Sequence, residues 1–338
     1  MDAKKPSLGP VAKAAWDRAV AAHEAGDIEA AEAAYREAAA EGDPDAAYHL
    51  GVILQDRGDY EAAARAFEQA ASAGDDDATV NLANLYADSL DRPEDAIRLY
   101  RKAIARGHNR GLVELGVLRA RQGRRNEAEE AFRQAIQGGE PNAHLELGSL
   151  LADSGRDQEA LAEFRRASDL GVAEAWKGMG AALARLSRLE EAEAALRRGV
   201  EAGDPENYRL LGNVLHRLGR LEEAEQAFQQ AIERGHLAAL VEYGDLLADW
   251  GGREAEAEVI YRQALDQGDT EAHVDLAELY RSSGRSQEAE REYRAALAAG
   301  HHRVHRDLGS LLAEQGRLLE AEAEFKKAIE HGDADPGS

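Results

Sequence analysis

The chain has 338 residues, a formal net charge of −24 at pH 7 and no cysteine. The acidic balance argues against a nucleic-acid partner, because phosphate binding needs a basic surface. Without cysteine, the chain forms neither disulfides nor thiolate metal sites. The first ten residues, MDAKKPSLGP, lack the apolar core of a signal peptide, and no run of 18 apolar residues occurs. We therefore expect a cytoplasmic protein with no membrane partner.

The predicted elements begin after a polar leader, residues 1–8, which we expect to be disordered. A helix from about Val11 to Ala25 follows. Over residues 9–333 a two-helix unit recurs at a period of 32 or 33 residues, and residues 334–338 form a C-terminal tail. A period in this range predicts a solenoid of stacked units, and the unbroken register indicates a single array of ten repeats.

Two series of residues fix the register of the repeat. The first is an alanine four residues before a large residue of the second helix, and its members are Ala31, Ala63, Ala96, Ala128, Ala160, Ala192, Ala224, Ala257, Ala289 and Ala321. The second is a small residue in the first helix, found at Gly51, Ala83, Gly116, Gly148, Gly180, Gly212, Gly244, Ala277 and Gly309. Because both series keep the same spacing, no separate domain interrupts them.

The unit at residues 205–236 shows why each half is predicted to be helical. Apolar residues recur at three- and four-residue steps in both halves, which places them on one face of a helix. Gly219 separates the two helices and Gly235 closes the second, as a glycine in the left-handed conformation does at a helix end. Gly212 and Ala224 are the expected points of close helix crossing.

The same unit carries a family resemblance. Its residues Leu211, Gly212, Leu215, Gly219, Ala224, Phe228 and Ala231 follow the pattern of the tetratricopeptide repeat, which this chain resembles. The links AEGDPDA, SAGDDDA and DQGDTEA look like those of Sel1-like repeats, and the family's usual closing proline is missing. The resemblance implies an all-α fold, an α-solenoid of about ten helix-turn-helix repeats in a right-handed superhelix. It also implies a non-enzymatic scaffold that binds other proteins.

No motif of an enzyme is present: the chain has no serine elbow, no phosphate-binding glycine loop and no HExxH. His301, His302 and His305 form the densest histidine cluster, with a spacing that could present two nitrogens to a metal ion. Yet His301 falls at an inter-unit link, and His305 takes the packing position that holds Trp176 and Tyr208 in other units. Repeat register explains both, so we expect no metal site and no cofactor.

By the resemblance, a concave groove is lined by first-helix residues three before, and one, four and five after, the register glycine. In the sixth and seventh units several of these residues are cationic or amide-bearing, and we call the set the basic cluster: Lys177, Arg185, Arg209, Asn213, His216 and Arg217. Arginine pairs with carboxylates in bidentate geometry. We therefore expect the groove to bind a peptide or helix of a partner protein, favouring an acidic segment or a C-terminal carboxylate. The alternative is internal pairing of Arg185 and Arg217 with Asp153 and Asp249.

The last unit suggests a second function. After it the sequence reads HGDADPGS, with no further amphipathic helix, although repeat arrays generally end in a polar cap. Phe325 and Ile329 are therefore expected to be partly exposed, unless charged neighbours mask them. A structural protein that self-associates through this end, forming a homo-oligomer, is the alternative to the scaffold.

Overall fold

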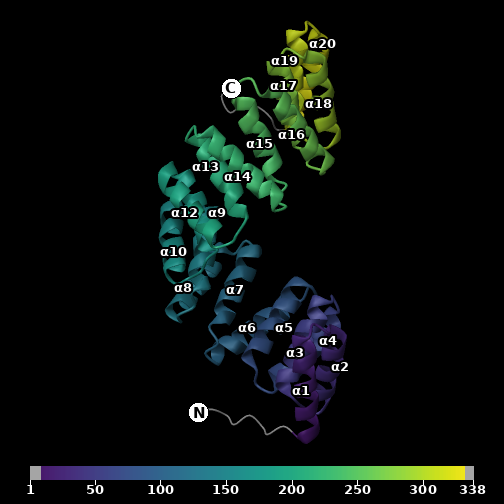
Figure 1. The fold of residues 1–338 in the computed structure, drawn as a ribbon, viewed down its shortest axis with the longest axis vertical. Coiled ribbons are helices and arrows are strands. Elements are labelled where there is room, and N and C mark those ends of the chain that lie inside the picture. Colours follow the sequence, from purple (N-terminus) through teal and green to yellow (C-terminus); the bar gives the residue numbers. More distant parts are fainter. Residues whose placement is uncertain (1–8, 332–338) are drawn as a thin grey trace. The chain divides into compact units, whose positions relative to one another are not determined.

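The computed structural model describes residues 9–331, so the leader at 1–8 and the tail at 334–338 lie outside the described residues. Those described contain twenty α-helices, one 3-10 helix and no strand. They divide into two compact units, Met1–Val172 (unit 1) and Ala173–Ser338 (unit 2), which are described separately (Figure 1). Each unit holds five helix pairs, which confirms the predicted all-α fold of ten helix-turn-helix repeats.

Unit 1 contains helices α1 to α10. Its first helices are α1 (Pro10–Glu24), α3 (Pro44–Asp56), α5 (Asp76–Asp88), α7 (Arg110–Arg121) and α9 (Asn142–Asp153). Its second helices are α2 (Ile28–Ala40), α4 (Tyr60–Ser72), α6 (Pro93–Ala105), α8 (Arg125–Gln137) and α10 (Asp157–Asp169). Each helix packs against the next along the chain.

Unit 2 repeats the arrangement with α11 to α20. Its first helices are α11 (Ala175–Arg185), α13 (Glu206–Arg217), α15 (Ala239–Asp249), α17 (Ala272–Ser282) and α19 (His305–Glu314). Its second helices are α12 (Leu189–Glu201), α14 (Leu221–Glu233), α16 (Glu254–Asp266), α18 (Ser286–Ala298) and α20 (Leu318–Glu330). The 3-10 helix η1 (His302–Val304) leads into α19.

In most pairs the two helices pack closely where a glycine of the first helix faces a large side chain of the second. A Cβ atom added at Gly212 in α13 would lie 2.7 Å from the ring of Phe228 in α14, which is fully buried. A Cβ atom added at Gly244 would likewise clash with the ring of Tyr261. Glycine in a helix costs roughly 1 kcal/mol relative to alanine, so packing rather than helix propensity requires it here. This confirms Gly212 as a point of close helix crossing.

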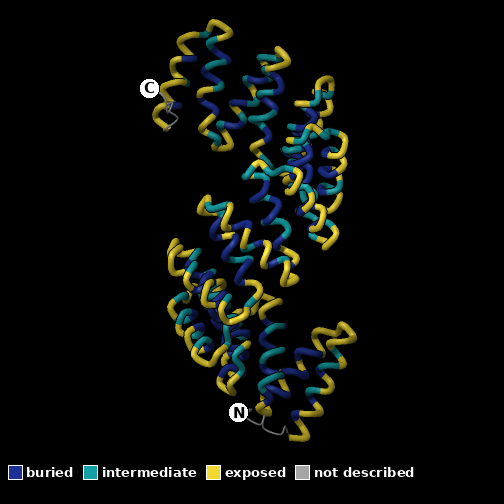
Figure 2. The backbone as a smooth tube through the Cα atoms, turned by 90° about the vertical axis from the view of Figure 1, so that its left-hand side faces the viewer, coloured by how far each residue is buried: buried dark blue, intermediate teal, exposed yellow. Residues whose placement is uncertain are grey.

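The turns also depend on glycine. Gly219, within a pair, has φ 73°, and Gly235, between pairs, has φ 87°. Both lie in the left-handed region that residues with a side chain rarely adopt. The predicted helix end at Gly235 is therefore confirmed. Buried residues lie along the faces where helices meet, whereas exposed residues gather at these turns (Figure 2).

An arginine ahead of many second helices links neighbouring pairs. Arg220 donates to Glu193 Oε2 of the preceding pair at 2.6 Å and to both carboxylate oxygens of Glu223 in the helix that follows it, α14, at 2.7 and 2.6 Å. The hydrogen bond from Arg220 lowers the pKa of Glu223. The same pattern of one inter-pair and one local carboxylate recurs at Arg156, Arg253, Arg285 and Arg317. This ionic linkage was not foreseen from the sequence.

Candidate interaction groove

The first helices of unit 2 form a continuous surface. Helices α11, α13, α15 and α17 contact one another in that order, in addition to their contacts with second helices. Side chains on the sides of these helices turned away from the second helices therefore lie next to one another across several repeats. We call this surface the inner face of unit 2.

A cavity of about 810 Å³ opens on this face, between α13, α15, α16 and α17. Its lining is strongly acidic, and we call it the acidic cavity. The carboxylates in the lining are Glu242, Asp245, Asp249, Glu254, Asp275 and Glu278. Against these six acids the lining includes one ionisable base, His216, and the amide of Asn213.

Four members of the basic cluster each make a polar side-chain contact within unit 2. Lys177 Nζ lies 2.8 Å from Glu206 Oε2, and Arg209 Nη1 lies 2.6 Å from Glu242 Oε1. His216 Nε2 lies 3.2 Å from Asp249 Oδ2, so this histidine rather than Arg217 faces Asp249. Arg217 donates to the backbone carbonyl of Ala184 at 2.9 Å.

The other two members of the cluster differ. Arg185 ends α11 and also takes part in polar interactions. Asn213 lines the acidic cavity, half-buried, and no residue of the described chain forms a hydrogen bond with its side chain. Its amide can both donate and accept, as a peptide backbone requires.

Burial and mutual repulsion shift the pKa values of the cavity's acids. Desolvation, together with the charge of Asp245, raises the pKa of Asp275 to about 6. Desolvation also raises the pKa of Asp245, although the Tyr261 hydroxyl donates to this carboxylate at 2.7 Å. One oxygen of Glu242, Oε2, is buried without a hydrogen-bond partner among the described residues. The cavity therefore carries negative charge that its own surroundings compensate incompletely.

Two of these acids lie at a position that the sequence reasoning left out. Glu242 and Asp275 come two residues before the register residues Gly244 and Ala277. An acid recurs at this position at Glu114, Glu146, Glu242, Asp275 and Asp307. This recurrence could have identified the position from the sequence. It was not used, because the groove was expected to be lined by residues three before, and one, four and five after, the register residue.

The last pair exposes apolar side chains. On α20, Ile329 is 64% exposed and Phe325 is 36% exposed, whereas Tyr293, the equivalent of Phe325 in the preceding pair, is fully buried. Leu318 and Leu319 at the start of α20 are also exposed. Within residues 9–331, α20 contacts α19 and η1.

Among the described residues, no helix is both long and apolar enough to cross a membrane.

Comparison with models of known protein families shows to which family the chain belongs. Models of the tetratricopeptide repeat match residues 48–111, 113–171 and 274–338, and related models of the same repeat match residues 205–234 and 12–37. The chain belongs to the tetratricopeptide repeat family. Such arrays use extended surfaces of stacked repeats to bind other proteins, so this tetratricopeptide repeat protein is best described as an interaction scaffold.

One solved structure agrees with the fold, and two others are similar to part of the chain. A tetratricopeptide repeat protein from Parabacteroides merdae is 19% identical, with a TM-score of 0.51 over 67% of this chain and 94% of its own. A Sel1 repeat protein from Oxalobacter formigenes is 20% identical, with a TM-score of 0.48 over 64% of this chain and 96% of its own. YrrB, a TPR protein described as having an unusual peptide-binding site, is 23% identical, with a TM-score of 0.40 over 51% of this chain and 93% of its own. No curated protein matches the sequence.

Proposed function

We propose that this scaffold holds a segment of a partner protein in the acidic cavity of unit 2, and that the segment is basic. The observation that carries the proposal is the charge of the lining, six carboxylates against one histidine. A lysine or arginine side chain entering there would approach Asp275 and Glu242. Its charge would favour the ionised form of Asp275, whose pKa is raised in the absence of a partner.

The contacts of the basic cluster also favour a positively charged segment as the occupant. Sequence alone favoured an acidic occupant, attracted by Lys177, Arg209 and Arg217. Lys177 and Arg209 already face carboxylates of unit 2 at 2.8 and 2.6 Å. An acidic segment would have to displace those partners, at the cost of leaving Glu206 or Glu242 without a cation. A basic segment can leave Lys177 and Arg209 with their carboxylates, because Oε2 of Glu242 has no hydrogen-bond partner among the described residues.

Asn213 gives the groove a second means of recognition. Its amide lies in the lining of the acidic cavity with no bond to the described chain, and can pair with the backbone of an extended peptide. Charge complementarity would speed association and select a segment of positive charge. Hydrogen bonds from Asn213 to the peptide backbone would fix the position of that segment.

Fluorescence anisotropy with two peptides of equal length, one rich in lysine and arginine and one rich in aspartate with a free C-terminal carboxylate, tests the proposal. We expect the basic peptide to bind more tightly, and more weakly at higher salt. The double variant Asp275→Asn, Glu278→Gln should lose affinity at least tenfold. The matched control Glu222→Gln, Asp266→Asn removes two charges from exposed positions on second helices and should bind as the wild type does.

Equal losses in the two double variants would mean that only net charge matters, and the cavity would not be the site. Tighter binding of the acidic peptide, lost in Arg209→Ala, would instead support the occupant that the sequence favoured.

The exposed apolar face of α20 favours a second candidate function, self-association with another copy of the chain. Phe325 and Ile329 lie where the second helices of earlier pairs meet a following repeat. Sedimentation velocity across a hundredfold range of concentration tests this. Association should weaken in Ile329→Glu, an exposed substitution that leaves the packing of α20 unchanged. A concentration-independent monomer would remove this candidate.

A further inference from the structure

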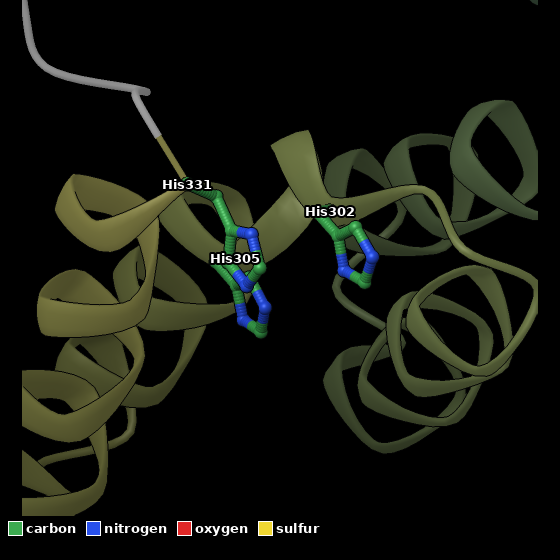
Figure 3. A group of neighbouring side chains, drawn as sticks. All are labelled: His302, His305 and His331. Atoms are coloured by element: carbon green, nitrogen blue, oxygen red, sulfur yellow. The ribbon is translucent and has the colours of Figure 1, made fainter.

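Three histidines meet at the end of unit 2, two of them close together in the sequence and the third, His331, 26 residues beyond His305 (Figure 3). His302 lies in η1, His305 begins α19, and His331 follows the last residue of α20. The ring centroids of His302 and His331 are 4.4 Å apart, and those of His305 and His331 are 5.6 Å apart. One ligand nitrogen of each ring lies within 4.8 Å of the corresponding nitrogens of the others.

The buried member of the group is already oriented. His305 Nδ1 lies 2.6 Å from Glu324 Oε2, which leaves Nε2 as the nitrogen available to a ligand. A carboxylate that holds one ring nitrogen, fixing the tautomer and the direction of the other, is the usual support of a metal-binding histidine. Lys327 Nζ holds the second oxygen of the same carboxylate at 2.8 Å.

The contact between this histidine and a glutamate is not special to the last repeat, because it recurs in others. His144 makes it with Glu163 at 2.6 Å, and His273 makes it with Glu292 at 2.7 Å. The last repeat differs because His302 and His331 are added beside His305. Between residues 9 and 331, this is the one group of three or more histidines and acids whose ligand atoms come this close together.

The rings now lie nearly parallel, within 9° of one another, and a bound ion would change that arrangement. Zinc binds imidazole nitrogen at about 2.0–2.1 Å, so tetrahedral coordination sets the nitrogens about 3.4 Å apart. The nitrogens must therefore approach by about 1.4 Å at most. His302 and His331 are exposed, and rotation about their side-chain torsions can supply this movement while His305 stays in place.

We propose that His302, His305 and His331 bind a divalent transition-metal ion, with Zn²⁺ as the natural occupant. Three neutral imidazoles and a water molecule form a common zinc ligand set, and imidazole favours zinc, copper and nickel over magnesium or calcium. The bound ion would join the segment leading into α19 to the end of α20. It would thereby tie down the terminal helix pair, whose outer face carries Phe325 and Ile329.

Titration of the full, tag-free chain with Zn²⁺ and with Co²⁺, after removal of metal by a chelator, tests the proposal. We expect one ion per chain, the visible absorption of tetrahedral cobalt, and a rise in melting temperature with added Zn²⁺. His302→Asn and His331→Asn, both at exposed positions, should each lower affinity at least tenfold and abolish the cobalt absorption. Glu324→Gln should lower affinity by about 10- to 100-fold.

Two control variants separate this site from other histidines. His273→Asn removes a histidine with the same carboxylate contact, and His301→Asn removes the residue next to His302, which contacts Thr270. Both should bind zinc as the wild type does. Affinity unchanged in His331→Asn, or lost equally in His301→Asn, would overturn the proposal, and so would absence of the cobalt absorption from the wild-type chain.

Discussion

The substitution Asp275→Asn should stabilise the protein at neutral pH. The Asp275 carboxyl lies in the acidic cavity, where burial and the charge of Asp245 oppose its ionisation. Asparagine has almost the same shape and no charge. The substitution therefore removes the cost of ionising this group in the folded state and leaves the packing of α17 intact.

The size of the effect follows from the pKa of Asp275, which rises from 3.8 to about 6. At about 1.4 kcal/mol per pH unit, this corresponds to an upper bound of about 3 kcal/mol of lost stability at neutral pH. The side chain is half-buried, and solvent screening reduces the expected gain to about 1–1.5 kcal/mol. Because the folded-state pKa is raised, the gain should be complete above about pH 6.5 and disappear as pH falls towards 4.

Urea unfolding followed by circular dichroism, at pH 7.5 and at pH 4.5, measures the gain. Asp266→Asn is the control, since Asp266 is exposed in the last turn of α16, where its removal should add no more than a few tenths of a kcal/mol. An equal gain at both pH values, or no gain at pH 7.5, would refute the reasoning. The same variant should weaken binding of a basic peptide, so stability and binding should change in opposite directions.

Two further predictions concern packing and pH. Gly212→Ala should destabilise unit 2 by about 1–3 kcal/mol in urea unfolding, because the added Cβ atom would lie 2.7 Å from Phe228; a stabilised variant would contradict the account of the helix crossing. The melting temperature should rise slightly from pH 7 to about pH 5, as Asp275 becomes protonated, and should then fall below about pH 4.5. The fall is expected because arginines lower the folded-state pKa of glutamates such as Glu129 and Glu258, whose contribution to stability is lost as they are protonated; a melting temperature that keeps rising below pH 4.5 would contradict it.

The sequence by itself determined the repeat, the two helices of each unit and the turns between them. These features depend on local spacing: apolar residues at helical steps, a glycine at most left-handed turns, and a small residue at a fixed register position. Among the described residues, Asp91 and Ser187 are left-handed without being glycine. Gly212 could be expected at a close helix crossing because a small residue recurs there in a fixed register, whereas its contact with Phe228 is seen only in the packed helices. Features that recur in every unit are visible in a single chain.

The charge of the candidate site was decided by tertiary structure. From the sequence, Lys177 and Arg209 were interpreted as cations that could bind a partner protein. In the structure they pair with Glu206 and Glu242 of the next repeat, which lie 29 and 33 residues away in the sequence. Single-sequence reasoning along one helix does not supply contacts between repeats. The recurring acids of the inner face could be seen in the sequence, but only the packed helices bury Asp245 and Asp275, and this burial raises the pKa of both. The packing also brings the charge of Asp245 near Asp275, which raises the pKa of Asp275 further.

The histidine group shows the same division. His302 and His305 stand together in the sequence, and repeat register accounted for His305 as a packing residue. His331 lies 26 residues beyond His305, after a complete helix, and reaches the group because α19 and α20 run antiparallel and return the chain to the start of the pair. Spacing along the chain determines which residues share a helix face, whereas the reversal of direction between helices determines which distant side chains meet.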